Sequence, residues 1–317
     1  MSTAAMADAI KPGLVYDFGG RNDRSFNQSA YTGAEAYKAR TGTAFRDFEI
    51  QNASQSEQAM RNFARRGLDP IVVIGFSQAG ALEKVAKEFP DTRFAIVDSV
   101  VDLPNVRSIV FKEEQGSYLV GMLAAMSSKS GKVGFIGGMD IPLIRKFACG
   151  YKQGVLAANP DAEIIENMTG TTGSAWTDPV KGGELAKSQF SQGVDVVFHA
   201  AGATGVGVLQ AAADQGKLGI GVDSNQNYLH PGSVLTSMVK SVDIAVDKAF
   251  DDAANGNWST GVQVLGLEES GVSFALDEFN KDLISEDMMK AVEAAKADII
   301  SGKVVVQDYM AENTCSY

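Results

Sequence analysis

Polar side chains follow several short apolar segments of the sequence, and their types are those that bind hydroxyl groups. The first such segment, GLVYDF, precedes GGRNDRSFNQSAYTG at residues 19–33. The polar residues at the ends of these segments are Asn22, Asp23, Asn27, Asp98, Asp223 and Lys240. Carboxylates and amides accept from and donate to hydroxyl groups, whereas three carboxylates would repel a phosphate. The set therefore predicts a neutral ligand that carries several hydroxyl groups.

Two patterns raise the question of an enzyme. GFSQAG places Ser77 between a strand and a helix, and Asp98 and His199 follow it in the order of a hydrolase triad. The nucleophile pattern G-x-S-x-G is incomplete, because Ala79 stands at its fifth position, so Ser77 is interpreted as a helix cap or a ligand contact. AAGATGVGVL, with Asp223 further on, imitates a dinucleotide fingerprint, but its glycines come in the wrong order. We expect no catalytic activity and no cofactor.

The segments that would position these residues alternate between strand and helix along nearly the whole chain. The short, continuously apolar runs are typical of parallel strands covered on both faces, and the helical runs between them fit right-handed crossovers. The alternation runs over residues 13–111 and restarts at KVGFIGG, residues 132–138. We therefore predict an α/β fold with two doubly wound parallel-sheet lobes. Ligands of such sheets bind beyond the carboxyl ends of the strands, where the polar residues lie.

Composition narrows the class of protein. The net charge is −11 and the pI is about 4.8, which argues against a broad nucleic-acid surface. Two histidines and two cysteines form no metal-binding pattern, and no apolar run has the length of a membrane span. Cys149 and Cys315 are either separate free thiols or one long-range disulfide, which an oxidising compartment would permit. The N-terminal segment MSTAAMADAI shows neither a basic region nor an apolar core of a secretory signal.

Long motifs in the chain resemble the basic membrane protein family of ABC-transporter substrate-binding proteins. They are GGRNDRSFNQSAYTG, FAIVDS, SGKVGFIGGMDIPLIRKFACGYKQG, NPDAEI, WTDPVKGGELA, AAGATGVGV, IGVDSNQN and PGSVLTSMVKSVDIAV. The resemblance covers residues 12–270 and implies a type I periplasmic binding protein whose two lobes are joined by a three-crossing hinge. We expect an N-terminal lobe of residues 1–111 plus 236–262, a C-terminal lobe of residues 112–235 plus 263–317, and a ligand cleft between them.

The resemblance also implies a function. Members of the family are receptors of ABC importers, and their ligands are typically nucleosides, purine nucleosides in the known representative. The implied partners are a membrane permease and its ATPase, and we expect a monomer in the periplasm. Many members carry a lipid-anchored cysteine at the mature N-terminus; none is seen here, so a freely soluble periplasmic protein is expected. The second interpretation is another small polar ligand on the same scaffold, such as a sugar, a free nucleobase or an autoinducer-like polyol.

Residue roles follow from the resemblance, motif by motif. Asp23 and Asn27, with Asn22, resemble the part that binds the edge of the base. Phe198 matches the aromatic residue that stacks on the base, and the ring on its other face is one of three candidates, Phe26, Tyr31 and Phe76. Asp98, Asp223 and Lys240 match positions that bind the sugar. Gly138 and Gly202 would let backbone amides approach the ligand closely. His199 stands where small residues are common in the family.

Overall fold

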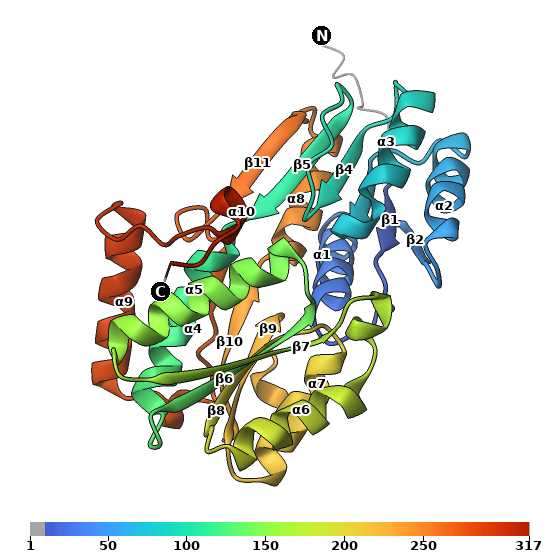
Figure 1. Ribbon diagram of the computed structural model, residues 1–317. Helices are drawn as coiled ribbons and strands as arrows, with labels where there is room; N and C mark the ends of the chain where they lie inside the picture. Colours follow the sequence, from blue (N-terminus) through green and yellow to red (C-terminus); the bar gives the residue numbers. More distant parts are fainter. Residues whose placement is uncertain (1–9, 317) are drawn as a thin grey trace. The chain divides into compact units, whose positions relative to one another are not determined.

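The computed structural model describes residues 10–316, and its contacts divide the chain into two compact units (Figure 1). Unit 1 holds the chain up to Asn22, together with Asn27–Val110 and Val242–Val264. Unit 2 holds Asp23–Phe26, Phe111–Ser241 and the chain from Leu265 onward. The segment examined above for a secretory signal lies largely outside the described residues.

Unit 1 is built on a six-stranded sheet. Its strand order is β11 (Gly261–Leu265), β5 (Val106–Phe111), β4 (Phe94–Val97), β3 (Ile71–Ile74), β1 (Gly13–Tyr16) and β2 (Arg46–Glu49). The pairs from β5 to β2 are all parallel. Strands β1, β3 and β4 are buried at every position, which agrees with their continuously apolar sequences.

Helices cover both faces of this sheet. They are α1 (Phe26–Thr41), α2 (Ser54–Arg65), α3 (Ala79–Glu88) and α8 (Val242–Ala254), with a short 3₁₀ turn, η1 (Phe76–Gln78). Helix α2 buries Ala59, Met60 and Phe63, at helical spacing, in the core beneath it. Helix α1 packs against α8 at Gly33, where a Cβ atom would lie 2.1 Å from the carbonyl oxygen of Asp243. That contact requires a residue without a side chain.

Unit 2 contains a second six-stranded sheet. Its order is β12 (Val272–Phe274), β10 (Val234–Lys240), β9 (Leu218–Asp223), β8 (Val196–Ala200), β6 (Lys132–Met139) and β7 (Glu163–Gly170). All neighbours are parallel except β10 and β12, which are antiparallel. Two lobes with parallel-dominated sheets and alternating helices confirm the predicted α/β fold.

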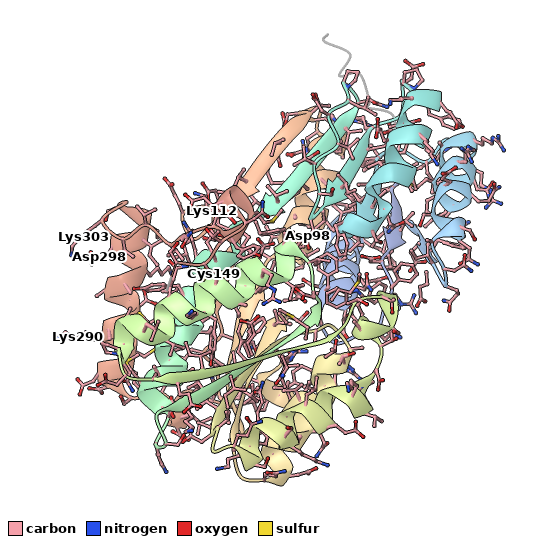
Figure 2. The ribbon with its side chains drawn as sticks, viewed as in Figure 1. Asp98, Lys112, Cys149, Lys290, Asp298 and Lys303 are labelled. Atoms are coloured by element: carbon pink, nitrogen blue, oxygen red, sulfur yellow. A yellow bond between two sulfur atoms is a disulfide. The ribbon has the colours of Figure 1, made fainter. Side chains whose placement is uncertain are left out.

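The helices of unit 2 form a layer on each face of its sheet (Figure 1). They are α4 (Glu113–Ser127), α5 (Pro142–Ala158), α6 (Pro179–Ser191), α7 (Thr204–Asp214), α9 (Glu286–Ile300) and α10 (Tyr309–Glu312), with the 3₁₀ turns η2 (Gly173–Trp176), η3 (Asn227–Leu229) and η4 (Lys281–Leu283). Near the end of α9, Asp298 pairs with Lys303 at 2.8 Å (Figure 2). Within residues 10–316, no helix has the length and apolarity of a membrane span.

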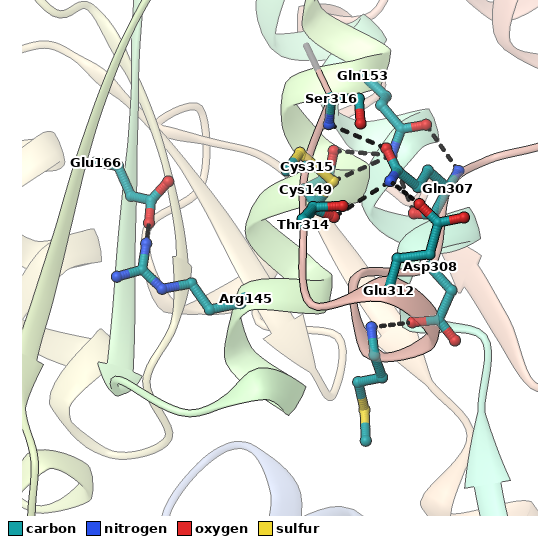
Figure 3. Close-up of a disulfide and its surroundings, with 11 residues drawn as sticks. Arg145, Cys149, Gln153, Glu166, Gln307, Asp308, Glu312, Thr314, Cys315 and Ser316 are labelled. Atoms are coloured by element: carbon teal, nitrogen blue, oxygen red, sulfur yellow. Dashed lines mark hydrogen bonds and ion pairs between the residues drawn. A yellow bond between two sulfur atoms is a disulfide. The ribbon is translucent and has the colours of Figure 1, made fainter.

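A disulfide fixes the C-terminal tail to helix α5 (Figure 3). It joins Cys149 to Cys315, with Cα atoms 5.7 Å apart, so the structure selects the disulfide from the two alternatives that the sequence left open. Beside it, the Gln307 backbone N–H donates to Gln153 Oε1 at 2.8 Å, and Gln153 Nε2 donates to the Gln307 carbonyl at 3.1 Å. The tail is therefore held by one covalent bond and a pair of amide hydrogen bonds.

The division of the chain differs from the predicted lobes at one crossing. The sequence placed residues 236–262 in the first lobe, but the structure keeps the chain in unit 2 as far as Ser241. The reason is strand pairing: β10 is hydrogen-bonded to β9 on one side and to β12 on the other. Residues 23–26 also group with unit 2, a short excursion that the sequence did not indicate.

Candidate binding site

The strand ends of unit 1 bring together a set of polar residues that we name the first cluster. Its members are Asp17, Asn27 and Ser77, which are joined by hydrogen bonds, and Asp98, which follows the neighbouring strand β4. The hydroxyl of Ser77 donates to Asp17 Oδ1 at 2.6 Å, and the Phe18 backbone N–H donates to the same oxygen at 2.8 Å. Burial raises the pKa of Asp17 to about 6, although both hydrogen bonds act to lower it. Asp17 is the most deeply placed acid of the cluster, and the sequence analysis did not select it.

Backbone geometry explains why these residues can lie so close together. Gly75 has φ +101°, and a Cβ atom on it would lie 1.9 Å from Asp17 Oδ2, so the carboxylate occupies the space of the missing side chain. Asn27 holds the chain after β1: its Oδ1 accepts from the Asp17 N–H at 2.9 Å, and its Nδ2 donates to the Asp17 carbonyl at 3.1 Å. Asp98 follows β4 with φ +68°. Aspartate adopts this left-handed conformation more readily than most residues.

The strand ends of unit 2 bring together a second cluster, whose members are Ser25, Glu113, Asp223 and Lys240. Asp223 ends β9 with φ +62°, and the buried Ser25 hydroxyl donates to its Oδ2 at 2.5 Å. Burial raises the pKa of Asp223, while Lys240 and then the Ser25 hydrogen bond lower it. Ser25 directly precedes helix α1, and its hydroxyl is directed to Asp223.

The segment 23–26 is held against unit 2 by hydrogen bonds along its length. The Ser25 N–H donates to Asp23 Oδ1 at 2.8 Å. Ser224 Oγ donates to the Ser25 carbonyl at 2.8 Å, and Gln226 Nε2 donates to the Arg24 carbonyl at 2.9 Å. Asp23 is buried, whereas Asn22, just outside the segment, is exposed. The structure thus places Asp23 with unit 2 and Asn27 with unit 1.

Lys240 ends β10 inside a shell of aromatic rings and one carboxylate. Its Nζ lies 3.1 Å from Glu113 Oε1 and 4.9, 5.2 and 5.6 Å from the ring centres of Phe26, Phe111 and Phe147. Ammonium groups are attracted to the faces of aromatic rings within about 6 Å. The structure therefore brings Phe26, Asp223 and Lys240 together, three residues that the sequence placed in the site.

A second buried lysine continues this charged group. Lys146 on α5 lies 3.1 Å from Glu113 Oε2 and 3.3 Å from Glu114 Oε2, and it donates to the Phe111 carbonyl at 2.7 Å. Burial alone would raise the pKa of Glu113, but Lys240 and Lys146 hold it below its ordinary value. Burial raises the pKa of Glu114 to about 7, although Lys146 opposes the shift.

The aromatic residues occupy positions of two kinds. Phe198 on β8 is fully buried, with ring centres 5.5 Å from Phe135 and 5.3 Å from Tyr151, so the structure places it in the interior of unit 2. Trp176, by contrast, is partly exposed and covers Gly138, where a Cβ atom would lie 2.1 Å from the indole. Gly202, with φ +56°, also adjoins Trp176. The two glycines therefore make room for an indole.

Two predicted aromatic residues belong to unit 1. Tyr31 lies on α1, its ring centre 4.8 Å from the Arg21 guanidinium carbon and 6.3 Å from the Phe45 ring centre. Phe76 opens η1 after β3 and is partly exposed. Tyr31 is therefore engaged by its own unit, whereas Phe76 lies beside Ser77 of the first cluster.

The geometry gives no support to the hydrolase interpretation. The partner of the Ser77 hydroxyl is Asp17. His199 is fully buried in unit 2, where its Nε2 lies 3.0 Å from Gln226 Oε1. Desolvation lowers the pKa of His199 to about 4, so its imidazole is neutral near pH 7. Among the described residues, no group of histidine, cysteine and acid side chains could hold a metal ion.

Sequence reasoning missed four residues of these clusters and their surroundings: Asp17, Glu113, Lys146 and Trp176. Asp17 could have been selected, because an acid at the end of an otherwise apolar strand is unusual. Glu113 and Lys146 carry no such signal, since charged residues in helices are usually solvated. Trp176 packs on Gly138, a contact between residues distant in the sequence that no local pattern indicates.

Comparison with known proteins now identifies the family. Residues 10–309 match the Bmp family, described as "ABC transporter substrate-binding protein PnrA-like". The chain belongs to this family. As a Bmp protein it is a substrate-binding component of an ABC transporter, a class that works with a membrane permease and an ATPase.

Individual relatives agree with this assignment over most of their length. The chain is 38% identical to the "CD4+ T-cell-stimulating antigen" of Listeria monocytogenes, covering 93% of this chain and 87% of the relative. It is 33% identical to the "ABC transporter nucleoside-binding protein BmpA" of Lactococcus lactis, covering 94% and 89%. A crystal structure of an ABC transporter solute-binding protein from Aeropyrum pernix has a TM-score of 0.85 and 30% identity, with 94% of each chain covered. The predicted family is confirmed.

Proposed function

We propose that this Bmp protein is a nucleoside receptor of an ABC importer, with a purine nucleoside as its first candidate ligand. The observation that carries the proposal is the second cluster, in which a buried aspartate and a buried lysine meet at the carboxyl ends of parallel strands. A relative described as nucleoside-binding, alike over nearly the whole chain, supports the choice of ligand.

The proposed contacts divide the nucleoside into sugar and base. Asp223 accepts from the vicinal ribose hydroxyls and Lys240 donates to their oxygens, while Asp98 contributes a further acceptor. Asn22, Asp23 and Asn27 provide the donors and acceptors for the edge of the base.

Rings would hold the faces of the base. The proposed stacking residues are partly exposed: Phe26, Phe76 and Trp176. Phe198 is buried against Phe135, so it would stack on a base only after the neighbouring core rings moved away. Stacking of a base on an aromatic side chain contributes about 1–3 kcal/mol in nucleic-acid complexes.

The proposal is tested by calorimetry on protein that has been unfolded, stripped of retained ligand and refolded. Adenosine, guanosine and inosine are compared with cytidine and uridine. We expect a Kd of about 1 μM or lower for a purine nucleoside, which corresponds to about −8 kcal/mol. Absence of heat with all five nucleosides would reject the proposal.

Substitution of Asp223 assigns the binding to the second cluster. Asp223→Ala should weaken binding about 10- to 100-fold, because a hydrogen bond to a charged group contributes about 1.5–3 kcal/mol. The matched control is Asp298→Ala, which removes a partly exposed carboxylate from α9 of the same unit and should leave Kd unchanged. Unchanged binding in Asp223→Ala would favour a ligand without ribose, and free base, ribose and other polyols are then the compounds to titrate.

We propose a periplasmic location and a monomer, with a permease and ATPase as membrane partners. The Cys149–Cys315 disulfide supports an oxidising compartment, since such bonds persist outside the reducing cytosol. Light scattering with and without nucleoside tests the monomer, and thiol titration of unfolded protein taken directly from cells tests the disulfide and with it the compartment.

A further inference from the structure

Glu113 occupies a position that the proposed ligand contacts do not use. It begins helix α4 and its side chain is 1% exposed. Its two carboxylate oxygens are divided between two buried ammonium groups: Oε1 lies 3.1 Å from Lys240 and Oε2 lies 3.1 Å from Lys146. A carboxylate in the first turn of a helix is further stabilised by the helix dipole. Glu113 is thus a fixed negative charge directly behind the lysine of the second cluster.

The charges around Lys240 come from several elements. Asp223 at the end of β9 interacts electrostatically with both Lys240 and Glu113. On the other side of Glu113, Lys146 of α5 faces Glu114 at 3.3 Å and Asp308 of the C-terminal tail at 3.6 Å. Two cations therefore face four acids, and Glu113 is the acid that joins the two lysines.

This arrangement changes what Lys240 can bind. An isolated buried ammonium group would attract a phosphate strongly, because charge interactions are little screened away from water. With Glu113 in contact, the pair is close to neutral, and Asp223 adds a further negative charge. A hydroxyl group can still accept from the Lys240 ammonium and donate to Asp223, but a phosphate would meet two carboxylates.

We propose that Glu113 is a positioning and specificity-determining residue, which fixes the Lys240 ammonium against Asp223 and offsets its charge, so that ribose hydroxyls are accepted and phosphate is rejected. The inference rests on the proposed function, since it concerns how the same site distinguishes a nucleoside from a nucleotide.

Two probes are used. The first is whichever of the five titrated nucleosides binds the wild type most tightly, and the second is the corresponding nucleoside 3′-monophosphate. The 3′-phosphate replaces one of the vicinal hydroxyls assigned to Asp223 and Lys240. We expect the wild type to prefer the nucleoside at least 100-fold. In Glu113→Gln the nucleoside should bind about fivefold more weakly and the 3′-monophosphate more tightly, so that the preference falls at least 10-fold.

The matched control is Glu114→Gln, the neighbouring carboxylate on the same turn of α4. Glu114 pairs with Lys146 at 3.3 Å, whereas the carboxylate 3.1 Å from Lys240 is that of Glu113. The preference of Glu114→Gln for the nucleoside should therefore stay within twofold of the wild type. Glu113→Asp separates charge from position. It keeps the negative charge but withdraws it by one methylene, so nucleoside binding should weaken about fivefold while the preference stays within twofold of the wild type.

A double substitution covers the case in which Glu113→Gln does not fold. Glu113→Gln/Lys240→Gln removes the buried pair together, and its nucleoside affinity should equal that of Lys240→Gln within twofold, because Glu113 acts through Lys240. A further loss of fivefold or more in the double variant would overturn the inference.

The outcomes separate the inference from the proposed function. If the wild type binds none of the five nucleosides, both are overturned. If the wild type binds a nucleoside but Glu113→Gln keeps the full preference over the 3′-monophosphate, the proposed function stands and the role of Glu113 is overturned. A fall in preference in Glu114→Gln equal to that in Glu113→Gln would overturn it as well, because the effect would then be general charge removal.

Discussion

Unit 1 and unit 2 have the same strand order, so their strand ends can be compared position by position. The order β11-β5-β4-β3-β1-β2 in unit 1 corresponds to β12-β10-β9-β8-β6-β7 in unit 2. In this correspondence β4 matches β9, and both strands are followed or ended by an aspartate in the left-handed conformation, Asp98 at φ +68° and Asp223 at φ +62°. The two sheets therefore present a carboxylate at the same place through the same backbone device.

The neighbouring strand end differs between the sheets. In unit 1, Val97 of β4 pairs with Ile109, so Asp98 lies opposite Val110 in the same register. In unit 2, Asp223 pairs with Val239. Val110 therefore corresponds to Val239, and the next residue of β5, Phe111, corresponds to Lys240 of β10. Strand β10 thus ends on a cation, whereas β5 ends on an aromatic ring, Phe111, which itself belongs to unit 2. Unit 1 instead surrounds its buried acid, Asp17, with neutral donors. The common topology therefore determines the position of a side chain at a strand end, whereas the charge at that position depends on the sequence of each strand.

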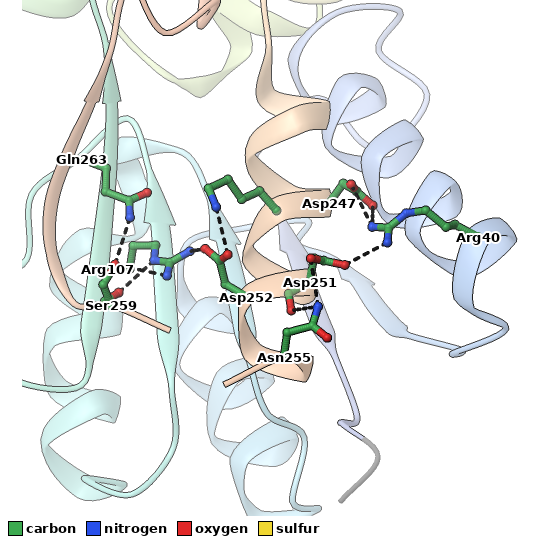
Figure 4. Close-up of polar contacts among 9 residues, drawn as sticks. Arg40, Arg107, Asp247, Asp251, Asp252, Asn255, Ser259 and Gln263 are labelled. Atoms are coloured by element: carbon green, nitrogen blue, oxygen red, sulfur yellow. Dashed lines mark hydrogen bonds and ion pairs between the residues drawn. The ribbon is translucent and has the colours of Figure 1, made fainter. Parts of the chain in front are cut away.

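The units also differ in what holds their peripheral elements. In unit 1, Arg107 forms a buried ion pair with Asp252 of α8 at 2.8 Å (Figure 4). Its guanidinium lies 4.2 Å from the centre of the Trp258 ring. Unit 2 relies on the Cys149–Cys315 disulfide. Each unit contains one tryptophan, Trp258 or Trp176, so fluorescence can report on the two separately.

The largest expected loss of stability follows from breaking the buried ion pair of unit 1. Asp252→Ala leaves the Arg107 guanidinium buried without its carboxylate and should lower the free energy of unfolding by about 3–5 kcal/mol. Denaturant unfolding followed by Trp258 fluorescence measures it. Asp251→Ala is the matched control on the same helix, because it removes an exposed ion pair with Arg40 that solvent already screens (Figure 4). Equal losses of unfolding free energy in the two variants would show that the buried ion pair contributes no more to stability than the exposed one.

The second effect belongs to unit 2. Cys315→Ser should lower the free energy of unfolding by about 2–4 kcal/mol, since a disulfide that closes a long loop restricts the unfolded chain. Trp176 fluorescence follows the transition, and Cys149→Ser should give the same loss. Reductant should destabilise the wild type and neither variant. If reductant shifted the Trp258 transition by as much as the Trp176 transition, the two units would unfold as one and the separate comparison would fail.

The third effect is a pH dependence of the stability of unit 1 that comes from Asp17. Burial raises the pKa of Asp17 from 3.8 to about 6, so the folded state binds its proton more tightly than the unfolded state. The stability of unit 1 should then fall as pH rises from about 4 to about 6, by at most about 3 kcal/mol relative to Asp17→Asn. In unit 2, Glu113 gives a slope of the opposite sign, because its lysines lower its pKa, whereas Glu114, whose pKa burial raises to about 7, gives a slope of the same sign at higher pH. Parallel pH profiles for wild type and Asp17→Asn would contradict this.

These contrasts also show which parts of the molecule the sequence could predict. Alternating apolar and helical segments predicted two parallel sheets, and a polar residue at the end of each apolar run predicted Asp98 and Asp223 as strand ends. Both signals are local. The burial of Glu113 and Lys146 was not predictable, because a charged residue in a helix has the same local pattern in solvent and in a core. Strand β10 was divided between the lobes for a similar reason, since its pairing depends on distant residues of β9 and β12.

The smallest expected effect is a change in tryptophan fluorescence when ligand binds, and it compares the two units at the proposed site. Trp258→Phe leaves Trp176 as the sole indole, and its emission, excited at a wavelength that nucleosides do not absorb, should change on titration with a purine nucleoside. Trp176→Phe leaves Trp258, which stacks on Arg107 within unit 1 and should show no change. A base can stack on the Trp176 indole only if the ring is partly exposed, as it is here. The indole packs on Gly138. A response from Trp258 alone would move the proposed contact with the base away from the Trp176 side of unit 2.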